Sequence, residues 1–340
     1  MAVTLKDVAE KAGVSRSAVS RTFTEGASVS KKTRAKVMSA ADLLGYSPNA
    51  LASSLTTGRT KLIGLISNNF HNPIFLSVFD QFTAGLQERG LRPLLLNLTD
   101  EMDIETSLRM MRTYSVDGVI VASSTLPPSF SEAFRDAGVP VVNSFGRHSP
   151  SPKIDTLGID NIEAGRMAAR EMIKRGYKRL GFLGGPERAT STQDRLSGFA
   201  QEVAGAEGVT MSQSFATQYS FDAGRTEMVA LLKDTPKEAY FCGDDVLSIG
   251  ALSAIQSAGL KVPDDIGLIG LNNIEMASWQ NINLTTIHNP IKQIIRTSID
   301  VIEEMLIDDT RKPQAQLFDC HVVERGTLRP QNTAVANVAV

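Results

Sequence analysis

The sequence predicts an all-α head of three short helices, a hinge helix, and a two-lobed α/β body with parallel sheets flanked by helices. Residues 1–46 carry three helical patterns separated by glycines, whereas apolar strand-like runs alternate with amphipathic helical patterns from residue 61 onward. The charge divides in the same place. Residues 1–59 hold nine Lys and Arg against four Asp and Glu, a net charge of +5, and the remaining 26 cations and 33 anions give −7. A basic head on an acidic body suits a polyanion bound at one end only.

Capping residues and apolar stripes define the head. Thr4 and Ser15 are placed to cap the first two helices, and Gly13 breaks the chain between them. A third helix is predicted from about Ser30 to Leu44, with Gly45 as its stop. Helix, tight glycine turn, helix at this spacing is the helix-turn-helix pattern. The expected core of the head consists of Leu5, Val8, Ala9, Ala18, Val19, Phe23, Val37, Ala40, Ala41 and Leu44.

The sequence predicts that residues 47–59 form a linker. Pro48 opens the segment Asn49–Leu55, which Thr56, Thr57 and Gly58 close. A segment of about seven residues is too short to hold a helix alone, because helix nucleation is costly. We therefore expect it to become helical only when something stabilises it.

The body reads as two parallel sheets in series. Continuous apolar strands separated by helices indicate parallel sheets covered on both faces, and ligands of such domains bind beyond the carboxyl ends of the strands. Thr156–Asn161 is a plausible crossing between the sheets. The expected strands are Leu62–Ile66, Pro93–Leu98, Val116–Ala122, Val139–Val142, Arg179–Leu183, Ala239–Cys242 and Ile266–Leu271, and the expected helices include Phe75–Arg89, Ile104–Tyr114, Ile162–Arg175 and Val246–Ala258.

The composition indicates a cytoplasmic protein without membrane spans. The chain of 340 residues is long enough for two or three domains. Cys242 and Cys320 lie far apart in apolar runs and are expected to be reduced thiols. The N-terminus has no signal-peptide pattern, and no apolar run approaches the length of a membrane span.

No motif supports catalysis, a cofactor or a metal. The neighbours Asp244 and Asp245 are the one acidic pair that invites an acid–base interpretation, and Asp245 is better explained as the cap of the following helix. The glycines near Gly184 do not form the dinucleotide pattern, and no Walker-type lysine is present. The four histidines are scattered without metal-ligand spacing. We therefore expect no enzyme activity.

An ordered set of short motifs runs through nearly the whole chain. It consists of Thr4–Ser15, Val19–Arg21, Val29–Ser30, Thr33–Arg34, Gly45–Tyr46, Pro48–Ala52, Gly158–Asn161, Gly181–Gly185, Arg195–Phe199 and Leu284–Thr286. In this order the motifs resemble the lactose-repressor (LacI/GalR) family of bacterial transcriptional regulators. The resemblance implies a dimer whose heads bind a near-palindromic DNA operator, and a body similar to the periplasmic sugar-binding proteins.

The resemblance also implies the domain boundaries. Residues 1–46 are the expected DNA-binding domain, 47–59 the hinge, and 60–340 the effector-binding and dimerisation domain. The chain is expected to cross between the lobes near Gly158, Asn289 and Phe318. This gives an N-lobe of about residues 60–158 and 290–318, and a C-lobe of about 159–289 and 319–330.

In a helix-turn-helix, the N-terminal residues of the second helix meet base edges in the major groove. Arg16 is the best specificity candidate, because a guanidinium can bond both O6 and N7 of guanine, although a phosphate contact is the alternative. Four further cations are expected either to contact phosphates or to form a solvated basic face, namely Arg21, Lys31, Lys32 and Arg34. The expected DNA-binding residues are Thr4, Leu5, Ser15, Arg16, Ser17, Ser20, Arg21, Thr33, Asn49, Ala52 and Leu55.

The hinge carries its own expectation from the resemblance. Leu55 corresponds to the leucine that the family wedges into the minor groove, and Ala52 packs against its dimer mate. An inserted apolar side chain costs base stacking but kinks the DNA and enlarges the contact. Ser54 stands where many relatives carry arginine, so minor-groove affinity is expected to be weaker than average.

Polar residues after the strand-like runs form the candidate effector site. Arg195 matches the arginine that holds effector in the family, and its fork of donors can grip vicinal hydroxyls or a carboxylate. Arg195 and Asp244 could instead simply pair with each other across a loop. For the other residues of this site, the alternatives are roles in the core, as helix caps or on the surface. The expected ligand-binding residues are Asn69, Ile74, Phe75, Ser123, Arg195, Tyr219, Asp244, Asn272 and Trp279.

At two of these positions the sequence departs from the family. Many relatives have asparagine where Asp244 stands and aspartate where Asn272 and Asn273 stand. Both side chains accept hydrogen bonds from hydroxyls, so a sugar or sugar derivative remains the default small-molecule effector, with a nucleobase or sugar acid as alternatives. A transport-system solute-binding protein and a regulator that uses a protein corepressor are the rival functions. The tail after Pro330 has no heptad, which favours a dimer over a tetramer.

Overall fold

The computed structural model describes residues 3–24, 26–49, 54, 58–98, 104–308 and 310–331. The chain divides into a head unit, Met1–Thr60, and a body unit, Lys61–Val340. Ala50–Ser53 and Leu55–Thr57, which include the expected hinge residues Ala52 and Leu55, lie outside the described residues.

Side-chain caps set the starts of the head helices, as the sequence predicts. Thr4 and Asp7 form a reciprocal capping box, and Ser15 and Ser30 each accept a backbone N–H of the helix that follows. Gly13 and Gly45 end the first and third helices in the left-handed conformation that glycine adopts without strain. The helices are α1 (Leu5–Ala12), α2 (Arg16–Phe23) and α3 (Lys31–Leu44), packed around Val8, Ala9, Val19, Val37, Ala40 and Ala41.

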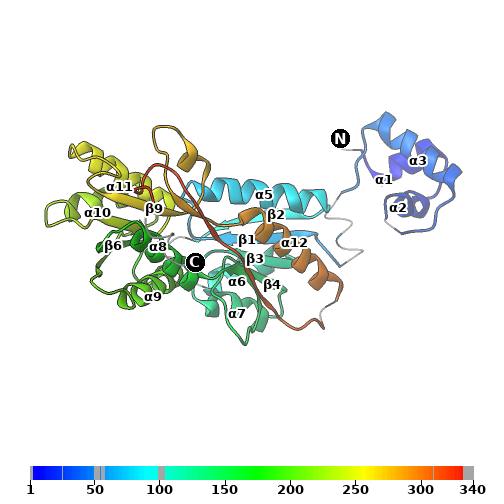
Figure 1. Ribbon diagram of the computed structural model, residues 1–340. Coiled ribbons are helices and arrows are strands. Elements are labelled where there is room, and N and C mark those ends of the chain that lie inside the picture. Colours follow the sequence, from blue (N-terminus) through cyan, green and yellow to red (C-terminus); the bar gives the residue numbers. More distant parts are fainter. Residues whose placement is uncertain are drawn as a thin grey trace, which may run out of the picture. The chain divides into compact units, whose positions relative to one another are not determined.

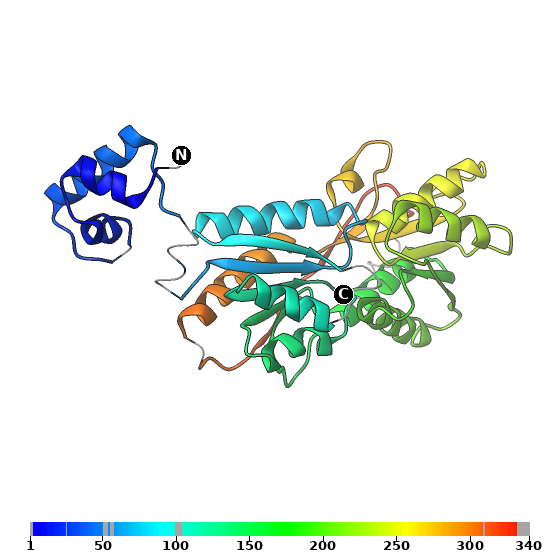
Figure 2. The ribbon, with the colours of Figure 1, turned by 180° about the vertical axis from the view of Figure 1, so that it is seen from behind.

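The first lobe of the body is a six-stranded parallel sheet in the order β2-β1-β3-β4-β5-β11. Figures 1 and 2 show the sheet from opposite sides, with α5 and α12 on one face and α6 and α7 on the other. Its elements are β1 (Leu62–Ser67), α5 (Ile74–Glu88), β2 (Arg92–Asn97), α6 (Ile104–Thr113), β3 (Gly118–Ala122), α7 (Pro128–Asp136), β4 (Val141–Ser144), β5 (Asp155–Ile159), α12 (Ile291–Ile307) and β11 (Ala315–Phe318).

The second lobe repeats this plan in the order β7-β6-β8-β9-β10-β12. All its strand pairs are parallel except β12 against β10. Helices α8 and α9 cover one face, and α10 and α11 cover the other. Its elements are α8 (Asn161–Lys174), β6 (Arg179–Gly184), α9 (Thr190–Ala204), β7 (Thr210–Phe215), α10 (Phe221–Leu231), β8 (Ala239–Cys242), α11 (Asp245–Ser257), β9 (Gly267–Asn272), the 3-10 helix η1 (Glu275–Ser278), β10 (Thr286–His288) and β12 (His321–Val323).

The chain passes between the two sheets at three short connections. These are Asp160 between β5 and α8, Asn289–Pro290 between β10 and α12, and Asp319–Cys320 between β11 and β12. The interpretation of Thr156–Asn161 as a crossing was wrong for most of its length. Residues 155–159 form the buried strand β5 between β4 and β11, which leaves Asp160 as the connection.

Two glycines let α8 and α9 approach closely beneath the second sheet. A Cβ atom added to Gly165 would lie 2.0 Å from the carbonyl oxygen of Arg195, and one added to Gly198 would lie 1.8 Å from the carbonyl oxygen of Ile162. Backbone therefore packs against backbone at this contact, and Arg195 belongs to it through its carbonyl oxygen.

We predict that Gly165→Ala destabilises the body. The added methyl group has to push α8 away from α9, and overpacking of this kind typically costs about 1–3 kcal/mol. For a body of this size, such a loss lowers the melting temperature by roughly 5 °C, measured by thermal denaturation. Gly205→Ala is the matched control, because its Cβ would meet its nearest neighbour at an ordinary 3.6 Å. Equal melting temperatures for both variants would contradict the packing argument.

Candidate functional site

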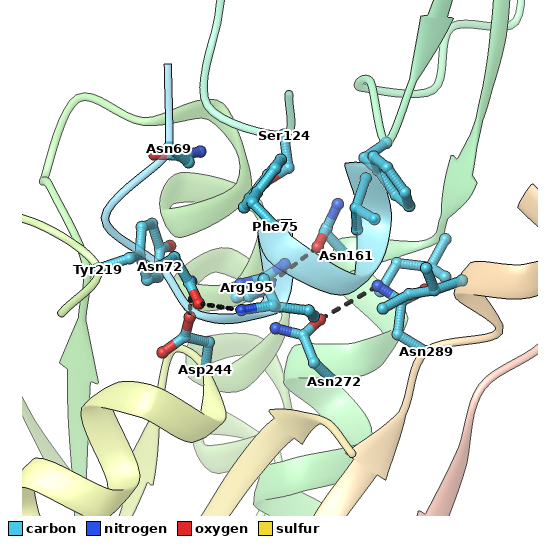
Figure 3. Close-up of a pocket in the computed structure, with 15 residues that line it drawn as sticks. Asn69, Asn72, Phe75, Ser124, Asn161, Arg195, Tyr219, Asp244, Asn272 and Asn289 are labelled. Carbon is cyan, nitrogen blue, oxygen red and sulfur yellow. Dashed lines mark hydrogen bonds between the residues drawn. The ribbon is translucent and has the colours of Figure 1, made fainter. Parts of the chain in front are cut away.

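A cavity lies between the two lobes, beyond the carboxyl ends of the strands (Figure 3). Its volume is about 570 Å³, open solvent at the mouth included. Ligand sites of parallel α/β folds are expected at this location. Apolar side chains come mainly from the first lobe and polar ones mainly from the second. The lining residues are Asn69, Asn72, Ile74, Phe75, Val78, Ser124, Phe145, Ile159, Asn161, Arg195, Tyr219, Asp244, Asn272, Asn289 and Ile291.

Arg195 is almost completely buried and is held by two neutral acceptors. Its Nε donates to Oδ1 of Asn161 at 2.8 Å, and its Nη1 donates to the carbonyl oxygen of Gly243 at 2.6 Å. Within the described part of the chain, Arg195 and Asp244 form no direct ion pair, because Asp244 is paired with Asn72 instead. The guanidinium is thus oriented from two sides while its charge is not cancelled by a direct carboxylate partner, which suits it for a polar ligand.

Asp244 stands at the start of α11 and faces the cavity. Its Oδ1 caps the helix by accepting the N–H of Leu247 at 2.9 Å, and its Oδ2 accepts a hydrogen bond from Nδ2 of Asn72 at 2.6 Å. Burial raises the pKa of this carboxyl from 3.8 to about 6, although both hydrogen bonds and the positive charge of Arg195 act in the opposite direction.

The next residue, Asp245, does not cap α11 as the sequence analysis expected. Asp244 is the cap, and Asp245 is the first residue of the helix. Its carboxylate accepts the N–H of Ile274 at 2.8 Å and the hydroxyl of Thr286. Burial raises the pKa of Asp245 to about 7. Asp245 thus ties the loop after β9 to β10, and the two acids serve different purposes.

Two asparagines line the side of the cavity next to the connection between β10 and α12. Asn272 follows the buried part of β9 with a φ of 118°, a region that asparagine tolerates better than most residues. Its Oδ1 accepts a hydrogen bond from Nδ2 of Asn289 at 3.1 Å. Asn289 is 8% exposed, and its Oδ1 is buried with no hydrogen-bond partner among the described residues. An unpaired buried acceptor is costly, so this atom is suited to a ligand's donor.

Contacts between the lobes surround the cavity. Asn72 of the first lobe donates to Asp244 of the second. At the rim, Arg147 makes a bidentate ion pair with the buried Asp194, with an Nε–Oδ2 distance of 2.9 Å. The carbonyl oxygen of Ser124 accepts the N–H of Ser191 at 3.2 Å and the hydroxyl of Thr190 at 2.9 Å.

The structure brings together most of the effector residues expected from the sequence. Tyr219 covers the flat surface left by Gly185, and its hydroxyl pairs with Thr192 at 2.7 Å. Asn69, Ile74, Phe75, Arg195, Asp244 and Asn272 also line the cavity.

Two expected residues do not line this cavity. The Ser123 hydroxyl turns inward and donates to Asn68 at 2.8 Å, so its neighbour Ser124 forms the wall. Trp279 lies next to η1 in a wider groove with Leu76, which adjoins the cavity and shares Ile74, Asn272, Asn289 and Ile291 with it.

Several lining residues escaped the sequence analysis. Asn161 and Asn289 closely follow strands β5 and β10, so the same strand-end rule would have found them once those strands were assigned. Phe145 follows β4, which the sequence did predict but ended two residues early. Ile159 is the last residue of β5 itself. Val78 and Ile291 are apolar helix residues that nothing in the sequence distinguishes from core.

The head exposes most of the residues expected to meet DNA. Arg16, Ser17, Ser20 and Arg21 lie exposed on α2, whereas Leu5 packs against the head core. The Ser15 hydroxyl is occupied as the α2 cap, and Thr33 accepts from Ser30 at 2.9 Å. Thr4 lies in the capping box, and Asn49 is exposed. Arg34, expected on the basic face, donates to the carbonyl oxygen of Thr22 at 2.8 Å and so ties α3 to α2.

Comparison with known proteins decides the family. Residues 4–49 match the bacterial regulatory proteins of the lacI family, and residues 169–328 match a periplasmic binding protein-like domain. The HTH-type transcriptional repressor PurR of Proteus mirabilis is 32% identical over 335 residues, 96% of each chain. The chain belongs to the lacI family of bacterial regulatory proteins. This membership makes it a ligand-responsive transcriptional repressor, and its relatives are repressors rather than enzymes.

Solved structures agree with the family over the whole chain. A lac repressor dimer bound to operator and the anti-inducer ONPF has a TM-score of 0.86 at 25% identity and covers 97% of this chain and 100% of its own. A complex of the transcriptional regulator CelR with cellobiose has a TM-score of 0.71 at 26% identity, covering 96% and 100%. The match of residues 4–49 to a regulatory head disfavours the solute-binding alternative. Across the described ranges, no helix has the length and apolarity to cross a membrane.

We predict that Asp244→Asn becomes more stable relative to wild type as the pH rises from 4.5 to 7.5. Because the folded-state pKa of Asp244 is about 6, above its ordinary 3.8, the group favours the folded state at low pH. That contribution is lost as the pH rises through 6, which lowers the free energy of unfolding by about 3 kcal/mol at most. The variant keeps the helix cap but loses the acceptor of the Asn72 hydrogen bond. Because the variant has no carboxyl to titrate at this position, its melting temperature relative to wild type should be higher at pH 7.5 than at pH 4.5.

Thermal denaturation at the two pH values measures this, with Asp234→Asn at an exposed position as the control. A melting-temperature difference between variant and wild type that is the same at both pH values would contradict this account.

Proposed function

We propose that the protein is a homodimeric repressor whose effector, a sugar or sugar derivative, binds between the lobes and controls how two heads hold a near-palindromic operator. One observation carries the proposal: both lobes line the same cavity, and Arg195 is buried and oriented at its polar side. A ligand that touches both lobes can favour one lobe orientation over another. A protein that merely stored a ligand would not need a DNA-binding head.

The chemistry of the wall supports a sugar. Five asparagines, one arginine and one aspartate supply paired donors and acceptors, as a hydroxyl-rich ligand requires. Phe75, Phe145 and Ile291 supply an apolar surface for the C–H face of a ring. The cellobiose complex of the related regulator CelR points to the same ligand class. A nucleobase is the second candidate, since aromatic walls also suit a flat ring.

Dimerisation is supported by the lac repressor, which binds its operator as a dimer. Two subunits related by a two-fold axis match a near-palindromic site. On the body, Leu76 is 79% exposed and Trp279 is 48% exposed, and both line one groove, an apolar surface that a second subunit would cover.

We propose that residues 1–46 bind DNA, 47–59 form the hinge, and 60–340 bind effector and the partner subunit. Two further expectations concern the hinge, namely that Leu55 enters the minor groove and that Ala52 packs against its mate. The cytoplasm is the compartment in which such a repressor meets its operator. An effector that spreads the two hinges would release DNA, and one that draws them together would act as a corepressor.

We predict that Arg16→Ala and Arg21→Ala have different effects on DNA binding. Loss of a bidentate guanine contact by Arg16 should weaken operator binding by about 1–3 kcal/mol and leave binding to a scrambled duplex nearly unchanged. Loss of a phosphate contact by Arg21 should weaken both and reduce the salt dependence. Fluorescence anisotropy with both duplexes measures this. Equal losses for Arg16→Ala on the two duplexes would assign Arg16 to phosphate instead.

The function itself is tested by anisotropy titration of the full-length protein on a palindromic duplex with a central CpG, followed by neutral sugars, sugar acids and nucleobases. We expect one sugar to change operator affinity about tenfold or more, a typical coupling between two sites. In Arg195→Lys, which keeps the charge but loses the planar fork, operator binding should persist and the response to sugar should be lost. Operator binding that no small molecule alters would contradict the proposal, and a response only to nucleobases would replace the ligand class.

A further inference from the structure

One polar contact between the lobes joins two buried side chains inside the cavity. Asn72 is 6% exposed and Asp244 is 2% exposed, and the amide nitrogen lies 2.6 Å from the carboxylate oxygen. The two residues are 172 positions apart in sequence and belong to different lobes. A hydrogen bond to a charged acceptor in such an environment is stronger than one in water.

Each partner of this bond is also fixed within its own lobe. Oδ1 of Asn72 accepts the N–H of Ile74 at 3.2 Å at the start of α5. Oδ1 of Asp244 accepts the N–H of Leu247 at 2.9 Å. This leaves Nδ2 of Asn72 and Oδ2 of Asp244 to form the hydrogen bond between the lobes (Figure 3). Because each side chain is fixed within its own lobe, the bond restricts the orientation of one lobe relative to the other.

We propose that Asn72 is a built-in substitute for the effector. In the ligand-free protein its amide occupies the acceptor on Asp244 that a ligand's donor takes when bound, and it holds the two lobes together. This inference rests on the proposed function, because it concerns the regulation of the same cavity. Asn72 is a positioning residue, and Asp244 determines which chemical groups the cavity accepts.

Replacement of the Asn72 amide on Asp244 restricts the chemistry of the effector. The group that replaces Asn72 has to be a hydrogen-bond donor, such as a hydroxyl or an N–H. A carboxylate or phosphate at that place would meet the buried carboxylate of Asp244 and be repelled. In the ligand panel, binding is therefore expected from neutral or amino sugars. A sugar acid that bound more tightly than its neutral parent would overturn this part of the proposal.

The test is hydrogen exchange of the full-length, ligand-free protein, followed by mass spectrometry at the Ser191 amide. This N–H donates to the carbonyl oxygen of Ser124 in the other lobe, so its exchange reports directly on separation of the lobes. Asn72→Ala and Asn72→Asp should each speed this exchange by about tenfold or more, because the first loses the donor and the second places two carboxylates together. Thr113→Ala is the control, since the exposed Thr113 hydroxyl donates to the carbonyl oxygen of Arg109 within α6 and lies outside the cavity lining.

The decisive variant is the exchanged pair Asn72→Asp with Asp244→Asn. It restores a donor and a carboxylate in reversed positions, and both local caps survive because each introduced side chain keeps an acceptor oxygen. Exchange at Ser191 should return to a rate close to that of wild type. Exchange that stays as fast as in Asn72→Asp, or unchanged exchange in Asn72→Ala, would overturn the proposal. No DNA or effector is used, so this result and the operator titration can fail independently.

Discussion

The structure depends on the burial of a few charged and polar groups where two parallel sheets meet end to end. The strands of both sheets end at one cavity. The polar side chains that follow them there either pair with each other or keep a hydrogen-bonding group that a ligand can use. Arg195 is satisfied by neutral acceptors and Asp244 by an amide from the opposite lobe, whereas one oxygen of Asn289 has no partner in the described part of the chain. Burying a charge is tolerable only with such partners. The cavity is thus set up to exchange internal partners for those of a ligand.

Pairing of the buried polar groups in the cavity is the means by which we propose that the body influences the head. Three short connections join the lobes, so a small rotation about them moves the ends of β1 and its neighbours relative to the second lobe. In the proposed function, residues 47–59 form a hinge that is too short to fold as a helix unaided, and we propose that its folding depends on how far apart the body holds the two copies. In this proposal, a difference of a few hydrogen bonds in the cavity biases an order–disorder step at the DNA.

The sequence predicted the head helices and the strands β1 to β4, β6, β8 and β9 because each of these signals is local, whereas β5, β7, β10, β11 and β12 were missed. Caps at Thr4 and Ser15, glycine stops and continuous apolar strands need no knowledge of distant residues. Site residues at strand ends were harder, because a loop turns neighbouring side chains to opposite sides: Ser124 faces the cavity and Ser123 does not, and Asp244 caps α11 where Asp245 was expected. The contact of Asn72 with Asp244 was not predictable, since it depends on how two lobes close.

The central claim is that the relative orientation of the lobes governs the grip of the heads on DNA. A disulfide across the rim, made with Ser124→Cys and Ser191→Cys at the existing backbone contact, would lock the lobes as they stand here. Operator affinity of the oxidised and reduced forms, measured with and without an active sugar, tests the claim most directly. The account predicts that the reduced form responds to sugar while the oxidised form holds one fixed affinity. An oxidised form that still responds fully would contradict it.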